Sequence, residues 1–192
     1  MEVARFIWWM AAAALVLAFA DILLRTFNRR RWIERATRER VLLAILEAGT
    51  LAGWLLVRGR WRFLPEPDTG VAFAGAMLAL TGALFAAWAK SRLGRLFSPQ
   101  LGVQEGHALI TTGPYAVVRH PIYLGLIDFI AGSALYWNDP ALLGVAVAFA
   151  LYFLAQIRVE ERILAAHFGG LWKEYREQTP ALFPRVLPRR KG

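Results

Sequence analysis

Long apolar runs alternate along the chain with short polar segments rich in proline or arginine. A run of about twenty apolar residues with few charges is typical of a transmembrane helix. Glycine and proline mark the ends of several runs, as they do at helix boundaries. We therefore predict an all-α, polytopic integral membrane protein with about five transmembrane helices, at residues 4–24, 41–57, 71–89, 121–137 and 141–157.

The connections between the runs indicate how the helices are arranged. Trp137-Asn138-Asp139-Pro140 is a tight turn whose proline suits the first position of a helix, so the last two spans form a hairpin. Residues 158–178 predict an amphipathic helix, interrupted at Gly169-Gly170, with Ile163, Leu164, Phe168, Leu171, Trp172 and Tyr175 near one side. A stripe of small residues predicts close helix packing, at Gly75, Gly82, Gly125 and Gly132.

Composition supports the membrane class. The 192 residues are 57% hydrophobic, with a mean hydropathy of +0.40. The chain has no cysteine, which excludes disulfides, thiolate catalysis and prenylation of the chain itself. Residues 1–20 resemble a signal sequence, but Arg5 is their only basic residue and the apolar run continues to Leu24. We expect this segment to be a retained first helix, and residues 1–192 to form a single membrane domain.

The formal charge of +9 follows the membrane pattern rather than a nucleic-acid site, because the basic residues flank the apolar runs. They concentrate in residues 25–40, 90–119 and 158–191. The connections on the other side of the membrane hold only Arg5, Arg58, Arg60 and Arg62. The positive-inside rule predicts an external amino terminus and a cytoplasmic carboxyl terminus. Short loops and a cysteine-free, arginine-rich chain favour the plasma (inner) membrane of a prokaryote.

Residues 113–123, which lead into the start of the fourth predicted span, carry candidate chemistry. The helix start next to His120 exposes amide groups that favour an anion. Arg119 adds a guanidinium that suits a carboxylate, and Tyr115 and Tyr123 offer π faces to a cation or an aromatic ring. The alternative is an interfacial belt of tyrosine and arginine at the level of the lipid headgroups.

A second ionisable cluster, Arg158-Val159-Glu160-Glu161-Arg162, follows the fifth predicted span. The two acids suit a hydroxyl-bearing or cationic ligand; the alternative is a solvated group of internal ion pairs. Since the hairpin places both clusters on the cytoplasmic side, we predict one composite site. Asp128 and Glu47 lie inside predicted spans, where acids are either functional or bonded between helices. The chain has three histidines, His107, His120 and His167. Their spacing is not that of metal ligands, so we predict no metal site.

The motifs of residues 104–184 resemble the isoprenylcysteine carboxyl methyltransferase family and, more loosely, the membrane phospholipid methyltransferases. The resemblance lies in His107-x-Leu109-Ile110-Thr111-Thr112-Gly113-Pro114-Tyr115, Arg119-His120-Pro121-x-Tyr123-x-Gly125, Arg158-x-Glu160-Glu161, Phe168-Gly169 and Tyr175. Trp172 stands where a tyrosine is common in the family. The first three spans, within residues 1–100, carry no matching motif.

The resemblance implies a methyltransferase that binds S-adenosyl-L-methionine in its 101–192 region and receives a lipophilic acceptor from the bilayer. Arg158 is then the candidate that orients a carboxylate acceptor, whereas His120 or Glu161 is the candidate base for an amine or thiol. The implied cofactor-binding residues are His107, Leu109, Gly113, Tyr115, Arg119, His120, Tyr123, Leu124, Glu160, Glu161 and Tyr175.

Two other functions fit the sequence. Membrane sterol or enone reductases carry distantly similar carboxyl-terminal segments and use NADPH, although they are usually longer. A non-catalytic membrane module is the third hypothesis, and it leaves Arg119, His120 and the two glutamates unexplained. The acceptor also stays open among an isoprenylated cysteine, a phospholipid amine, a quinone-like lipid and a small thiol.

Overall fold

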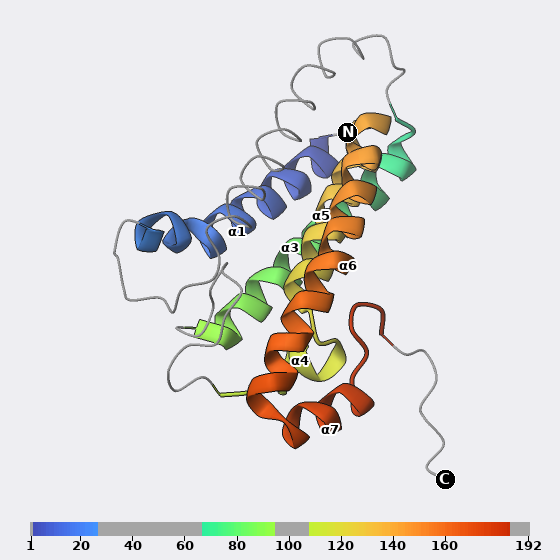
Figure 1. Ribbon diagram of the computed structural model, residues 1–192. Coiled ribbons are helices and arrows are strands. Elements are labelled where there is room, and N and C mark those ends of the chain that lie inside the picture. Colours follow the sequence, from blue (N-terminus) through green and yellow to red (C-terminus); the bar gives the residue numbers. More distant parts are fainter. Residues whose placement is uncertain (1, 27–66, 95–107, 185–192) are drawn as a thin grey trace.

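The regular structure in the described part of the chain is helical, with no strand. The computed structural model describes residues 2–26, 67–94 and 108–184. Its helices are α1 (Glu2–Thr26), α3 (Thr69–Leu93), α4 (Pro114–Val117), α5 (Pro121–Trp137), α6 (Pro140–Phe168) and α7 (Gly170–Gln178). Figure 1 shows α3, α5 and α6 running side by side, with α4 and α7 at one end.

The helix positions agree with the hydrophobic pattern. Helix α5 has the predicted bounds, and α3 and α1 extend their predicted spans by a few residues at each end. Helix α6 joins the predicted span at 141–157 to the predicted helix that follows it and ends at Phe168, so it carries the second charged cluster on an unbroken helix. By length and hydropathy α3 and α6 are able to cross a membrane, and α5 is a shorter apolar helix. The predicted span at 41–57 and Glu47 lie outside the described residues.

Glycines hold α3 and α5 in close contact, as the small-residue stripe predicts. A Cβ atom on Gly82 would lie 2.6 Å from the carbonyl oxygen of Gly125, and one on Gly75 would lie 2.6 Å from the amide nitrogen of Tyr136. Only glycine permits this approach of the two backbones. Asp128, whose Cβ also faces Gly82, is half-buried at the same interface.

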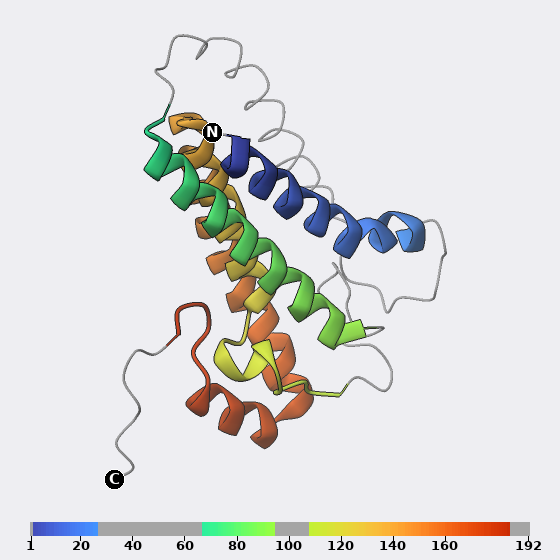
Figure 2. The same ribbon diagram turned by 180° about the vertical axis from the view of Figure 1, so that it is seen from behind.

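Helix α1 starts beside α3 and diverges from it along its length, as Figure 2 shows from behind. Its Trp8 reaches α5, where the indole nitrogen donates a hydrogen bond to Ser133 Oγ at 2.9 Å. The same ring stacks on Tyr136 at 5.9 Å. Ala11 lies fully buried against Ala79 and Ala83 of α3. The described helices therefore form one packed bundle.

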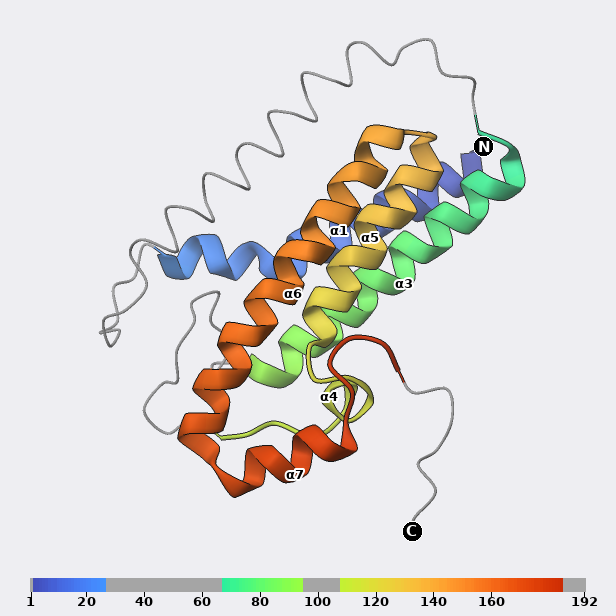
Figure 3. The same cartoon turned by 45° about the vertical axis from the view of Figure 1, so that its right-hand side comes forward.

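The turn between α5 and α6 has the predicted hairpin geometry. Asn138 ends α5 with a φ of 48°, and Asp139 Oδ1 accepts the amide of Ala141 at 2.9 Å, which caps α6. The hairpin brings the start of α5 and the end of α6 to the same end of the bundle (Figure 3).

At that end the chain breaks at Gly169, whose φ is +53°, and α7 then lies across the bundle end (Figure 3). This confirms the predicted interruption. Helix α7 buries Trp172 and Tyr175, whereas Leu171 is 66% exposed. The prediction that Leu171 shares their apolar side was wrong, because restarting the helix after the break turns this residue outward.

Candidate functional site

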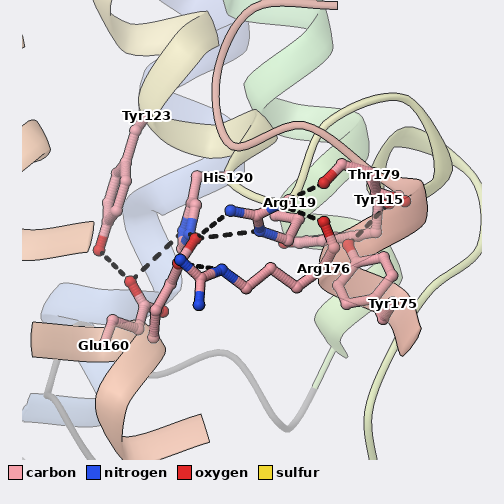
Figure 4. A network of polar contacts seen from close by, with 9 residues as sticks. Tyr115, Arg119, His120, Tyr123, Glu160, Tyr175, Arg176 and Thr179 are labelled. Carbon is pink, nitrogen blue, oxygen red and sulfur yellow. Dashed lines mark hydrogen bonds and ion pairs between the residues drawn. The ribbon is translucent and has the colours of Figure 1, made fainter. Parts of the chain in front are cut away.

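The two sequence clusters meet at the end of the bundle where α5 starts and α6 ends (Figure 4). Tyr123 Oη donates a hydrogen bond to Glu160 Oε2 at 3.0 Å. The His120 ring lies between the two acids, with Nδ1 3.6 Å from Glu160 Oε2 and Nε2 3.3 Å from Glu161 Oε1. Residues about forty positions apart in the sequence thus share one polar network, as the hairpin predicts.

Glu161 is the most heavily bonded acid of this network. Its Oε1 accepts Arg119 Nε at 3.0 Å and Nη2 at 2.6 Å. Arg176 of α7 places its Nε 3.6 Å from Oε2. The side chains of Glu161 and Arg119 are only 13% and 8% exposed, so the pair is largely withdrawn from water. Such a pair is stable only with both partners present.

Arg119 also fixes the chain that follows α7. Its Nη1 donates to the carbonyl oxygens of Arg176, at 3.1 Å, and of Thr179. The backbone amides of Arg119 and His120 donate to the carbonyls of Pro180 at 2.8 Å and Ala181 at 3.0 Å. In this structure the guanidinium is therefore directed to Glu161 and to the end of α7, rather than outward to an anion.

Aromatic rings line the Tyr123 side of the cluster. The Tyr123 ring stacks on His120, with centroids 5.6 Å apart and planes at 4°, and on Phe153 of α6, at 4.5 Å and 9°. These contacts hold the Tyr123 hydroxyl toward Glu160. Because the ring already stacks on two neighbours, we infer that its hydroxyl, rather than its π face, contributes to the site.

Tyr115 and Tyr175 join α4 to α7. Tyr175 Oη donates a hydrogen bond of 2.7 Å to the carbonyl oxygen of Tyr115. Burial raises the pKa of both hydroxyls well above their ordinary value, so both stay neutral. Gly113 has a φ of +65° and starts α4, as the predicted Gly-Pro turn requires. These residues thus fix α4 against α7 next to the polar network.

Of the two acids, Glu160 has carboxylate oxygens that can still accept hydrogen bonds from a ligand. It is 35% exposed, and Tyr123 is the neutral donor bonded to it. Arg158 is exposed on α6, and within the described ranges no hydrogen bond or ion pair engages it. Leu109 and Leu124 are partly buried. His107 lies outside the described residues.

Sequence reasoning missed three contributors on the α7 side. Arg176 contacts Glu161, Thr179 supplies a carbonyl to Arg119, and the Trp172 ring lies 5.9 Å from the Arg119 guanidinium. Arg176 looks like any exposed helix charge in the sequence, and a backbone carbonyl leaves no signal in residue type. The buried position of Trp172, in contrast, agrees with the predicted apolar side of this helix.

A bundle of apolar helices with a buried network of arginine, histidine, glutamate and tyrosine at one end defines a membrane protein with a composite polar site. Residues 71–170 match the family model described as phospholipid methyltransferase. This match covers about half of the chain and includes the two sequence clusters of the network, although not its α7 residues. The chain belongs to the phospholipid methyltransferase family.

Curated relatives carry several names. The chain is 40% identical over 84 residues to the cobalt-zinc-cadmium resistance protein CzcN of Cupriavidus metallidurans, covering 43% of this chain and 38% of that one. It is 30% identical over 152 residues to methanethiol S-methyltransferase 2 of Bradyrhizobium diazoefficiens, covering 77% and 52%. It is 30% identical over 118 residues to protein-S-isoprenylcysteine O-methyltransferase B of Arabidopsis thaliana, covering 58% of each. The chain thus spans about half the length of these relatives or less.

The fold is also similar to a solved structure. The eukaryotic intramembrane Ras methyltransferase, an isoprenylcysteine carboxyl methyltransferase, superposes with a TM-score of 0.58 over 90% of this chain and 60% of that one, at 18% identity. This similarity of fold, together with the family match and the named relatives, confirms the expected resemblance to the isoprenylcysteine carboxyl methyltransferases.

Proposed function

We propose that the chain transfers a methyl group from S-adenosyl-L-methionine to a lipophilic acceptor at the cytoplasmic face of the membrane. Membership of the family and the methyltransferase names of two relatives support this reaction over the reductase and the non-catalytic module. The observation that carries the proposal is the partly exposed Glu160, which Tyr123 holds beside His120 in a network of residues from α5, α6 and α7.

The residues present fit the cofactor. It carries a ribose diol and an ammonium group, which suit the unsatisfied lone pairs of Glu160. It also carries a carboxylate, which suits Arg176, whose side chain is 63% exposed. Glu160, Tyr123 and His120 would hold it directly. Arg119 and Glu161 would act by fixing α7 over the site, because their polar groups are already bonded to each other.

When bound, S-adenosyl-L-methionine supplies an electrophilic methyl group on a positively charged sulfur. The protein then has to align an acceptor in line with that methyl group and keep water out. Arg158 is available to orient an anionic acceptor. For a thiol or an amine a base is needed, and the contacts favour His120 or Glu160 over Glu161, whose oxygens already face Arg119 and Arg176.

A transfer assay tests the proposal. The purified full chain in nanodiscs is incubated with methyl-labelled S-adenosyl-L-methionine and one of three acceptors, N-acetyl-farnesylcysteine, methanethiol or phosphatidylethanolamine. We expect label in at least one acceptor, and its loss in Glu160→Gln. Absence of label in all three, with a folded wild type, counts against this function.

The proposed orientation rests on the positive-inside rule, and the absence of cysteine makes it easy to test. Leu171→Cys and Val3→Cys each introduce a single thiol on a side chain that is at least 64% exposed. In intact cells a membrane-impermeant maleimide should label Val3→Cys only, and in permeabilised cells it should label both. The reverse pattern in intact cells would place the site outside.

A further inference from the structure

Trp172 of α7 holds a buried hydrogen-bond donor that nothing accepts. The side chain is 3% exposed. In the part of the chain that the structure describes, its indole Nε1 is the one buried side-chain nitrogen or oxygen without a hydrogen-bond partner. Buried donors are nearly always bonded, since leaving one unpaired has an energetic cost. An unpaired buried group therefore calls for an explanation.

The position of Trp172 places this donor beside the polar network. Its ring lies 5.9 Å from the Arg119 guanidinium and 5.6 Å from the Tyr175 ring. Trp172 thus sits on the face of α7 that closes the end of the bundle. A guanidinium only donates hydrogen bonds, so Arg119 cannot accept the indole hydrogen, and neither Glu161 nor the carbonyls that Arg119 binds accept it.

Figure 4 shows the network extending from Tyr123 and Glu160 at one side to Tyr175 and Thr179 at the other, and Glu161 between them accepts from Arg119 and lies beside Arg176. Glu160 and the Tyr123 hydroxyl lie together at one side, and the two arginines reach in from the α7 side, where Arg176 is 63% exposed. Trp172 belongs to the α7 side through its contacts with Arg119 and Tyr175. An acceptor that carries negative charge is favoured next to these guanidinium groups, and a hydroxyl or an ammonium is favoured near Glu160.

We propose that the Trp172 indole N–H donates a hydrogen bond to the carboxylate of the cofactor's amino-acid end. This rests on the proposed function, in which S-adenosyl-L-methionine is the ligand. The carboxylate is the one anionic group of that ligand, and it lies at the opposite end from the adenine. Binding then supplies the missing acceptor and removes the cost that the ligand-free protein carries. Trp172 is in this way a binding residue that selects ligands with an intact amino-acid end.

The test compares Trp172→Phe with the wild type in detergent solution. Phenylalanine keeps an aromatic ring on α7 but removes the N–H. Two ligands are titrated by calorimetry: S-adenosylhomocysteine, which has the carboxylate, and 5′-deoxy-5′-methylthioadenosine, which lacks the amino-acid end. Thermal unfolding without ligand is recorded for both proteins. Trp9→Phe, on the exposed Trp9 of α1, is the matched control for loss of an indole.

We expect Trp172→Phe to bind S-adenosylhomocysteine about tenfold more weakly, the usual effect of losing a hydrogen bond to a charged acceptor. Its affinity for methylthioadenosine should equal that of the wild type, and its unfolding temperature should be unchanged or higher. Trp9→Phe should leave both affinities unchanged. A structural tryptophan would behave differently, because truncating it lowers the unfolding temperature and affects both ligands alike.

Three results overturn the inference. Equal affinities of wild type and Trp172→Phe for S-adenosylhomocysteine would show that the N–H does not meet the ligand. An equal loss for both ligands would place its partner away from the carboxylate, and a lower unfolding temperature with weaker binding would make Trp172 structural. Failure of the folded wild type to bind S-adenosylhomocysteine at all would instead remove the proposed function, and this inference with it.

Discussion

Glu160 and Glu161 are adjacent in the sequence but differ in their surroundings, so the same substitution should have different effects. Glu161→Gln leaves the Arg119 guanidinium, 8% exposed, without its counter-charge. Removing one partner of a buried pair costs about 3–5 kcal/mol. Since the glutamine oxygen still accepts one hydrogen bond and two carbonyls still hold Arg119, we expect about 3 kcal/mol.

Glu160→Gln should be mild for stability and severe for binding. Glu160 is 35% exposed and accepts one hydrogen bond, from Tyr123, so its loss should cost about 1 kcal/mol or less. A loss of 1 kcal/mol lowers the unfolding temperature of a chain of this size by about 2–4 °C. Glu161→Gln should therefore lower it by roughly 10 °C and Glu160→Gln by no more than about 4 °C.

The assay is thermal unfolding in detergent followed by tryptophan fluorescence, with S-adenosylhomocysteine binding measured on the same samples. The double substitution Arg119→Gln with Glu161→Gln should be more stable than the sum of the single effects predicts, because it leaves no unpaired charge. Equal destabilisation by Glu160→Gln and Glu161→Gln would refute the division between a structural and a ligand-binding acid. So would a stable Glu161→Gln that has lost only its ligand.

Two further substitutions test the packing around the site. Gly82→Ala should destabilise the bundle by about 1–3 kcal/mol, since its Cβ would lie 2.6 Å from the Gly125 carbonyl oxygen, and Gly144→Ala, with open space around it, should be neutral or stabilising in the same unfolding assay. Tyr175→Phe should cost about 1–2 kcal/mol by leaving the Tyr115 carbonyl without its donor. Because burial raises the pKa of Tyr175, the neutral hydroxyl should contribute fully to stability below the ordinary tyrosine pKa of about 10, and this contribution should fall at higher pH. Tyr175→Phe should therefore lose less stability than the wild type as the pH is raised above about 10. An equal loss of stability with pH in both proteins would argue against a buried hydroxyl.

Much of the fold was predictable because apolar runs and turn residues give strong local signals. The bounds of α5, the Asp139-Pro140 start of α6 and the break at Gly169 all follow from proline, glycine and capping chemistry. The helix at residues 158–168 was expected, but not that it continues the fifth span without a break. The number of membrane crossings stays a prediction.

The sequence predicted which residues meet at the site, but not which of them bond to each other. The hairpin brings His120 and Tyr123 to Glu160 and Glu161, as expected from topology. That Arg119 binds Glu161 and the end of α7 depends on how α7 folds back, which no local pattern determines. For the same reason the sequence did not separate the two acids. Cofactor contacts with Leu109, Gly113, Tyr115, Leu124 and Tyr175 remain predictions from the family resemblance.

The most direct test of the account is calorimetric binding of S-adenosylhomocysteine to the wild type and to Glu160→Gln, with NADPH titrated in parallel. We predict that the wild type binds S-adenosylhomocysteine, that Glu160→Gln binds it at least about tenfold more weakly while remaining folded, and that neither binds NADPH. Binding of NADPH alone, or equal binding of S-adenosylhomocysteine by both proteins, would contradict the assignment of this network as a methyl-donor site.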